Sequence, residues 1–207
     1  IKPEILKLVV DEFPNLSSQK QAVTKFENNK EVKFASQGMQ ILSPSALNLN
    51  SYLQSDVMLQ WLNDLTGINE TLISDPYLSG GGYHEIKTGG FLKIHADFNK
   101  HPKINLDRRL NMLIDLNENW NNEWGGDLQL FDENIDVAVQ KIFPLFNRAV
   151  IFNTTSTSYH GHPDPLKCPR DRSRRSLAYY YYTAGNLKNK DSKQSHSTLF
   201  KQQKNEE

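Results

Sequence analysis

The stretch Phe91-Leu92-Lys93-Ile94-His95-Ala96-Asp97-Phe98 has the composition of a β-strand and carries two potential metal ligands. Residues two apart in a strand project from the same face of the sheet. His95 and Asp97 can therefore reach one metal ion together, and a third ligand must come from another strand. Two histidines and one carboxylate on one side of an ion leave its other side open, an arrangement typical of non-haem Fe(II).

The sequence on both sides of this strand predicts a mainly β protein. After Pro76 it divides into short segments rich in β-branched and aromatic residues, separated by Gly, Asn, Asp and Pro. Strands are predicted near residues 82–87, 91–98, 109–117, 127–131, 136–142, 148–153, 157–162 and 174–183. Short strands at this spacing favour a sandwich, jelly roll or barrel over βαβ units.

The first third of the chain has the pattern of helices. Apolar residues at helical spacing predict one helix over residues 19–28 and a longer one over 45–65, which Thr66-Gly67 ends. We expect an α+β protein in which residues 1–70 form a helical layer on a β-core at 77–184. Together they make a single domain, residues 1–185, followed by a loosely packed polar tail, 186–207.

Composition excludes several classes of function. The 24 basic and 24 acidic residues give a net charge of zero, which argues against nucleic-acid binding. The apolar runs are far shorter than the roughly 20 residues that span a bilayer. Cys168 is the only cysteine, so an intramolecular disulfide and a thiolate-rich metal site are excluded. With no secretory signal pattern at the start, a reducing, cytoplasmic location is expected.

The third metal ligand is predicted from the segment 158–163, which contains His160 and His162. His160 is favoured because it is closer to the preceding strand and because Gly161 lets the backbone approach a ligand. His162 remains the alternative, as a ligand or as a group near the metal. The other histidines are interpreted as surface or hydrogen-bonded core residues: His84, His101 and His196.

A receptor for a carboxylate is predicted in the last strand. Arg174 and Ser176 lie two apart in Arg174-Arg175-Ser176-Leu177-Ala178 and so share a face. A guanidinium fork beside a hydroxyl suits a carboxylate at the closed end of a barrel.

These motifs together resemble the 2-oxoglutarate- and Fe(II)-dependent dioxygenases, specifically their prolyl 4-hydroxylase-like group. The resemblance covers residues 77–184 and includes Gly89-Gly90, Trp124-Gly125-Gly126-Asp127 and His160-Gly161-His162-Pro163. It implies a double-stranded β-helix, or jelly roll, with His95, Asp97 and His160 as ligands of Fe(II). Arg174 and Ser176 would bind the 5-carboxylate of 2-oxoglutarate. O₂ would be the second cosubstrate, with ascorbate as an accessory reductant.

One position departs from the family pattern. Relatives usually carry tyrosine where Asp115 stands, and that tyrosine commonly hydrogen-bonds the 5-carboxylate. An inward-facing, ionised Asp115 would repel this carboxylate unless a cation such as Arg174 lies between them. Asn111 lies on the same face of the predicted strand and is expected to line the pocket as well.

The expected reaction is hydroxylation of an unactivated C–H, with release of succinate and CO₂. By resemblance the substrate is a peptidyl proline, and a free amino acid or other small molecule is the alternative. A catalytically inactive jelly-roll binding module is the third hypothesis. A peptide enzyme needs an open channel, which we expect the loops 99–108 and 118–125 to border.

Overall fold

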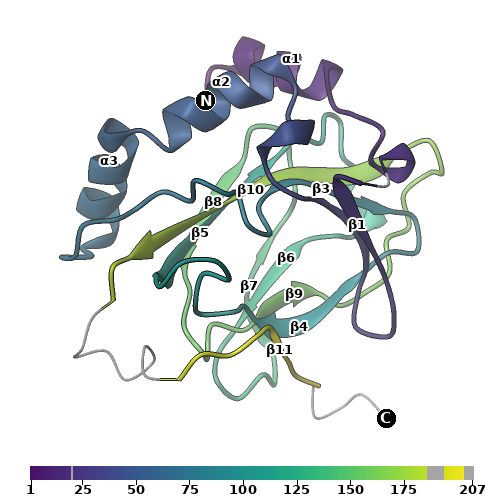
Figure 1. Cartoon of the computed structure of the whole chain (residues 1–207). Helices are drawn as coiled ribbons and strands as arrows, with labels where there is room; N and C mark the ends of the chain where they lie inside the picture. The colour runs from purple at the N-terminus through teal and green to yellow at the C-terminus, as the bar shows by residue number, and fades with distance from the viewer. Residues whose placement is uncertain (20, 186–193, 203–207) are drawn as a thin grey trace.

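The computed structural model describes residues 1–19, 21–185 and 194–202, and it consists of two antiparallel sheets under a layer of helices (Figure 1). The major sheet has the order β1 (Val23–Glu27), β2 (Val32–Ser36), β3 (Gly82–Lys87), β10 (Ser173–Thr183), β5 (Asp107–Asp115) and β8 (Ala149–Asn153). The minor sheet has the order β11 (Leu199–Phe200), β4 (Leu92–Ala96), β9 (His160–His162), β6 (Leu128–Phe131) and β7 (Ala138–Ile142). This architecture confirms the jelly-roll prediction.

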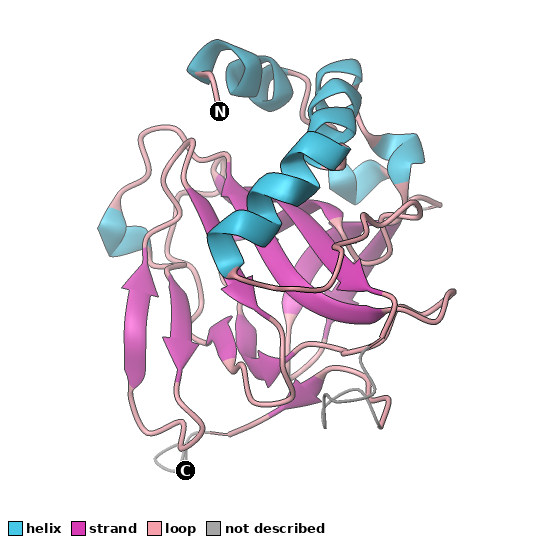
Figure 2. Cartoon of the chain, turned by 90° about the vertical axis from the view of Figure 1, so that its left-hand side faces the viewer, coloured by secondary structure: helices cyan, strands magenta, loops and turns pink. Residues whose placement is uncertain are grey.

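The helices α1 (Pro3–Asp11), α2 (Pro44–Leu53) and α3 (Asp56–Thr66) lie over the major sheet, as Figure 2 shows from the side. Their buried apolar side chains form one core with alternate residues of β10, including Leu177, Tyr179 and Tyr181. Tyr180 and Tyr182 point the opposite way, into the space between the sheets, where they pack with Phe98. The strand alternation in the Tyr-rich segment thus separates a structural face from a face that lines the interior. None of the helices that the structure describes is long and apolar enough to cross a bilayer.

The helix predicted over residues 19–28 is wrong. Val23–Glu27 form strand β1, which pairs with β2 in an antiparallel hairpin. Val, Thr and Phe favour strands, and the side chain of Asn28 accepts hydrogen bonds from the backbone of Lys30 and Glu31, which closes the turn. A window of ten residues cannot reveal that β2 also pairs with β3, a strand that lies about 50 residues further along the sequence.

The single helix predicted over 45–65 is two helices. Gln54 ends α2, and the side chain of Ser55 caps α3 by accepting a hydrogen bond from Met58 N at 3.4 Å. The predicted stop is confirmed, since Gly67 ends α3 in the left-handed conformation with φ of 67°.

All eight predicted strands are present, and two further differences concern the regions next to them. In residues 99–108, expected to form a loop at the border of a channel, His101, Asp107 and Arg108 are buried. Of the predicted tail, 194–202 is described, and its strand β11 pairs with β4 rather than being loosely packed. Residues 186–193 and 203–207 lie outside the described residues.

Candidate active site

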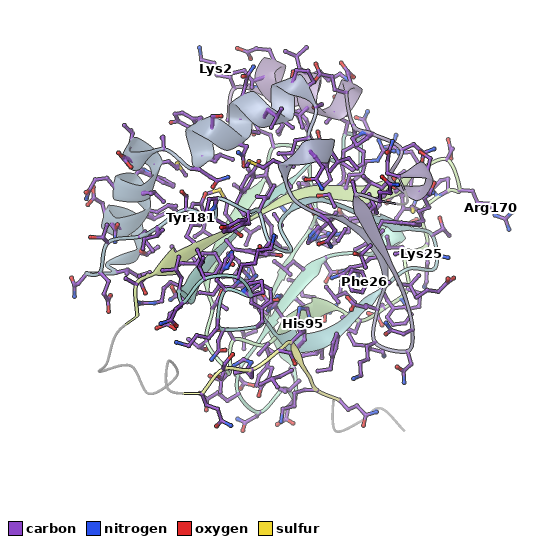
Figure 3. The ribbon with its side chains drawn as sticks, in the orientation of Figure 1. Lys2, Lys25, Phe26, His95, Arg170 and Tyr181 are labelled. Carbon is purple, nitrogen blue, oxygen red and sulfur yellow. The ribbon has the colours of Figure 1, made fainter. Side chains whose placement is uncertain are left out.

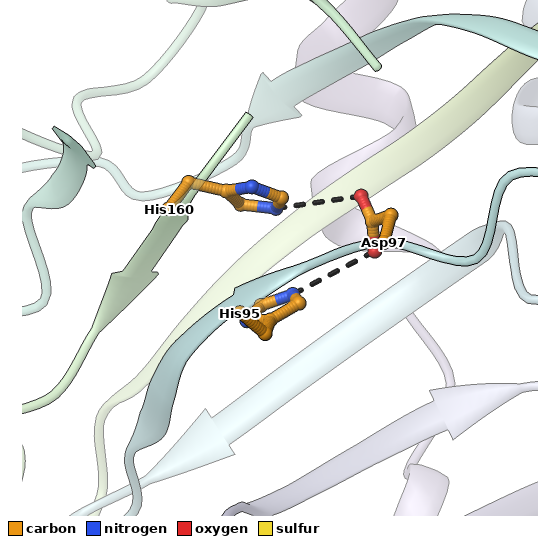
Figure 4. Close-up of side chains that lie close together, drawn as sticks. All are labelled: His95, Asp97 and His160. Carbon is orange, nitrogen blue, oxygen red and sulfur yellow. Dashed lines mark ion pairs between the residues drawn. The ribbon is translucent and has the colours of Figure 1, made fainter. Parts of the chain in front are cut away.

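Three side chains from two neighbouring strands converge in the minor sheet (Figure 4). His95 lies in β4, Asp97 directly follows that strand, and His160 begins β9, opposite His95 in the antiparallel register. His95 Nε2 lies 3.6 Å from Asp97 Oδ1, and His160 Nε2 lies 3.4 Å from Asp97 Oδ2. One ligand atom from each residue falls within 4.8 Å of the other two, so the group can hold one metal ion. The structure thus brings together the three residues that the sequence singled out.

Backbone carbonyls orient both imidazole rings. Nδ1 of His95 lies 2.8 Å from Lys93 O, and Nδ1 of His160 lies 3.0 Å from Ser158 O. A carbonyl can only accept, so this network assigns the proton to Nδ1 and leaves the Nε2 lone pair of each ring free. Both Nε2 atoms face Asp97, which is the orientation that metal coordination requires. The donor set therefore fits a divalent metal such as Fe(II).

The protonation states also suit a metal site. Burial, together with the neighbouring His95, lowers the pKa of His160 to about 4, so the ring is neutral at physiological pH. Burial alone would raise the pKa of Asp97. The cation of Arg108 and the two imidazoles outweigh this effect and hold the pKa of Asp97 well below its usual range. A neutral imidazole and an ionised carboxylate are the forms that bind metals.

A buried polar network holds Asp97 from behind. Arg108 Nη2 donates to Asp97 Oδ2 at 3.0 Å, and Asn111 Nδ2 donates to the same oxygen at 2.7 Å. Asn111 Oδ1 in turn accepts from Arg108 Nε at 2.9 Å and from Thr154 Oγ1 at 3.2 Å. The side chain of Arg108 is completely buried. Asn111, which is predicted to line the cosubstrate pocket, uses its amide to position Asp97, one of the three candidate metal ligands.

A β-bulge explains why the sequence did not indicate Arg108. In a regular strand, residues 108 and 111 would face opposite sides. The pairing of β5 with β10 skips Arg109, because Tyr181 pairs with Leu110 and Tyr182 with Arg108. The extra residue turns Arg108 to the inner face, where its guanidinium carbon lies 3.4 Å from the centre of the Tyr180 ring.

A cavity of about 240 Å³ opens beside the three ligands. Among the described residues it is lined by His95 and Asp97 from β4 and its end, by the β1–β2 hairpin, and by β3, β10 and β11. Phe26 of β1 is one of its walls, and Figure 3 labels Phe26 and His95. A second cavity of about 500 Å³ shares Gln37, Gly80 and Phe98 with the first.

The two loops expected to border a channel contribute unequally to the lining of these cavities. Residues 99–108 supply Pro102 and Lys103 to the larger cavity, whereas 118–125 supply no residue to either one. In that second loop Trp120 is buried and donates to Gly125 O at 3.0 Å, so it anchors the loop.

The C-terminal strand contributes a wall that the sequence did not indicate. Phe200 of β11 is opposite His95 in the β11–β4 register, and their ring centres are 5.5 Å apart. Both Thr198 and Phe200 line the smaller cavity. Alternating Thr198-Leu199-Phe200 is a weak strand signal, but only long-range pairing places it at the metal site.

The predicted carboxylate receptor lies deeper between the sheets. Arg174 and Ser176 are both buried on the same face of β10. Arg174 Nε donates to Gly126 O at 2.8 Å, and its Nη2 lies 3.7 Å from Asp115 Oδ1, too far for a hydrogen bond. Gly126 has φ of +80°, and a Cβ there would come within 3.1 Å of Arg174 Cδ, so the glycine allows the arginine to pack against the turn. Asp115 faces Arg174, as an inward orientation requires.

His162 lies on the same face of β9 as His160 and is buried, but it is not part of the metal-binding group. Neither of its ring nitrogens has a hydrogen-bond partner. Burial, and then the charge of Arg174, keep the pKa of His162 well below its usual value. The ring is therefore a neutral polar group available to a ligand between the metal site and Arg174.

Comparison with known protein families supports the interpretation of this group as a metal site. The family model described as 2OG-Fe(II) oxygenase superfamily matches residues 81–182, which include the three ligands and Arg174. No curated protein matches the sequence significantly.

Similar solved structures share the fold at low identity. A prolyl hydroxylase from Trichoplax adhaerens, in complex with a hypoxia inducible factor oxygen degradation domain peptide fragment, has a TM-score of 0.65 at 20% identity over 87% of this chain and 79% of its own. A prolyl-4-hydroxylase from Pseudomonas putida has a TM-score of 0.62 at 13% identity over 88% of each chain. HygX from Streptomyces hygroscopicus, with nickel, 2-oxoglutarate and hygromycin B bound, has a TM-score of 0.52 at 12% identity over 93% of this chain and 88% of its own.

At these identities the likeness establishes the fold and leaves the substrate open. The family model, together with the His-Asp-His group, implies Fe(II) and 2-oxoglutarate as metal and cosubstrate. The part of the chain that holds this site, residues 81–182, belongs to the 2OG-Fe(II) oxygenase superfamily.

Proposed function

We propose that this oxygenase hydroxylates a prolyl residue within a peptide. The observation that carries the proposal is that the two cavities are adjacent and share lining residues. The one beside His95 and Asp97 shares Gln37, Gly80 and Phe98 with a larger one, which is lined by residues from the segments 37–40, 76–80 and 98–103. An extended chain can place one residue at the metal and its neighbours in the second cavity.

The chemistry divides between the cofactors and the chain. Bound Fe(II) and 2-oxoglutarate supply oxidation of a C–H bond by O₂, coupled to decarboxylation to succinate and CO₂. In this proposal His95, Asp97 and His160 hold the metal, while Arg174 and Ser176 hold the distal carboxylate of 2-oxoglutarate. The buried Arg108–Asn111 network keeps the Asp97 carboxylate in one orientation.

The walls of the cavity position the substrate and limit water. Phe26, Phe98 and Phe200 present aromatic surface beside the metal ligands, which suits a compact apolar ring such as that of proline. Open space beyond Gly80 accommodates the flanking main chain. The similarity to prolyl hydroxylases, one of them bound to a peptide, supports this choice.

The test is turnover of a library of proline-containing peptides with Fe(II), 2-oxoglutarate, ascorbate and air. We expect one oxygen atom to be gained on a prolyl residue, with succinate formed in equal amount, and no turnover by His95→Ala. Free amino acids form the parallel arm. If oxygen is transferred only to free amino acids, the substrate is a small molecule and not a peptide. If no succinate is formed with any peptide or amino acid, the result favours a binding module.

A further inference from the structure

Asp115, the last residue of β5, is an acidic group in the place where the proposed function puts the carboxylate of the cosubstrate. Only 4% of its side chain is exposed. Its Oδ1 has no hydrogen-bond partner, although Arg174 Nη2 is 3.7 Å away. Across the β5–β10 pair it lies opposite Ser176. Asp115, Arg174 and Ser176 therefore belong to one buried polar site.

The surroundings of Asp115 favour its neutral form. Burial raises the pKa of Asp115 to about 6, against the opposing influence of Arg174 on β10 and Arg148 in the turn before β8. These two arginines are the charged groups that act on it from the neighbouring elements. Arg148 donates to Phe143 O at 2.8 Å and is partly exposed, so Arg174 is the cation that directly faces the carboxyl group.

Binding of 2-oxoglutarate would bring its distal carboxylate, a second acidic group, next to Asp115 and so change which protonation state of Asp115 is favoured. Arg174 already gives one N–H to Gly126 O, so its remaining donors would face two carboxylates at once. Two carboxylates that share a buried site do not both stay ionised, and the more weakly stabilised one keeps a proton. A protonated carboxyl group also changes from acceptor to donor, which the second carboxylate needs.

We propose, on the basis of the proposed function, that Asp115 takes up one proton from solvent when 2-oxoglutarate binds and donates the new O–H to the distal carboxylate beside Arg174. One O–H bond forms on Asp115 and no other covalent bond changes. The polar atoms near Arg174 agree with a polar ligand, because both ring nitrogens of His162 are also buried without partners.

The proposal predicts linked proton and ligand binding. Above pH 6 the free Asp115 is increasingly ionised, so each further pH unit weakens 2-oxoglutarate binding by up to about tenfold. The effect levels off where Asp115 stays ionised in the complex. An asparagine at this position donates a hydrogen bond at every pH and removes the dependence.

The experiment is anaerobic calorimetric titration of 2-oxoglutarate into the Fe(II)-loaded protein between pH 6 and 8, in buffers of different ionisation enthalpy. We expect uptake approaching one proton per ligand at pH 8 for the wild type and for Asp127→Asn, the matched control at a partly buried carboxyl group next to Gly126. Uptake falls to near zero in Asp115→Asn. Asp115→Tyr, with a neutral hydroxyl donor, is the second variant in case asparagine prevents folding, and it too takes up no proton.

The outcomes separate the two proposals. Equal proton uptake in the wild type and both Asp115 variants, with 2-oxoglutarate bound in each, overturns the role of Asp115 and leaves the oxygenase intact. If 2-oxopentanoate, which lacks the distal carboxylate, binds more tightly than 2-oxoglutarate at every pH, the cosubstrate assignment itself fails. In that case Asp115 remains ionised and pairs with Arg174.

Discussion

Arg108 donates a 3.0 Å hydrogen bond from Nη2 to Oδ2 of Asp97, so a fully buried cation is bound to the only acidic residue of the metal-binding group. The contact fixes the carboxylate plane and leaves Oδ1 on the side of His95. The hydrogen bond also draws negative charge away from the Asp97 carboxylate, and this affects how strongly the carboxylate binds a metal ion. The site therefore depends on a residue that does not face the metal directly.

Replacing this arginine should weaken the metal site. Arg108→Gln keeps some hydrogen bonding but removes the charge and the stacking on Tyr180, so we expect about a 10- to 100-fold loss of Fe(II) affinity. Competition with a chromophoric chelator measures it. Arg109→Gln is the matched control, because Arg109 pairs with Glu70 near the surface and its loss should leave Fe(II) affinity unchanged. Equal losses in the two variants would contradict a positioning role for Arg108.

The histidines should separate by role. His95→Ala and His160→Ala should abolish Fe(II) binding and succinate formation, since each removes one of three ligands. His101→Ala should keep both, yet lower the free energy of unfolding by about 1–3 kcal/mol, because Asp75 and the backbone N–H groups of Lys103 and Ile104 lose a buried partner. Metal titration and chemical denaturation of the same samples distinguish these effects. Tight Fe(II) binding by His95→Ala would refute the ligand set.

The terminal strand offers two neighbouring residues with different functions. Phe200 lines the cavity, so Phe200→Ala should raise the KM for the substrate several-fold and leave Fe(II) affinity unchanged. Leu199 packs on the core of the minor sheet around Ile94 and Phe131, so Leu199→Ala should instead cost about 1–2 kcal/mol of stability. Steady-state kinetics and thermal unfolding of both variants test this division. A KM effect of the same size in Leu199→Ala would show that the strand acts only through folding.

Acid should destabilise the metal-free protein partly through His84. Burial lowers the pKa of His84 to about 3, below its ordinary value of about 6.5. Between these values the unfolded chain binds a proton that the folded chain does not. Stability is therefore greatest above pH 6.5 and falls as the pH drops towards 3, by at most about 1.4 kcal/mol per unit from this residue. In His84→Gln the slope of unfolding free energy against pH should be shallower, and an unchanged slope would exclude this contribution.

Local patterns predicted the strands of the β-core and the ligands within it. Alternation and turn residues are encoded within a few positions, and His95 and Asp97 share a face for that reason. The same local logic failed at residues 19–28. There a short apolar pattern at helical spacing concealed a strand whose stability comes from pairing with β2, and through β2 with β3.

From short, regular spacing the sequence by itself indicated the strands of the jelly-roll core and placed His95 and Asp97 on one face, and its motifs together indicated the family and His160 by resemblance. Only the tertiary structure decided that Arg108 turns inward at a bulge, that Phe200 returns to lie beside His95, and that Asp115 lies buried against Arg174. These three features depend on contacts between residues far apart in the chain or on an irregularity in one strand. A local pattern carries no information about either, because packing and strand pairing across the whole fold select them.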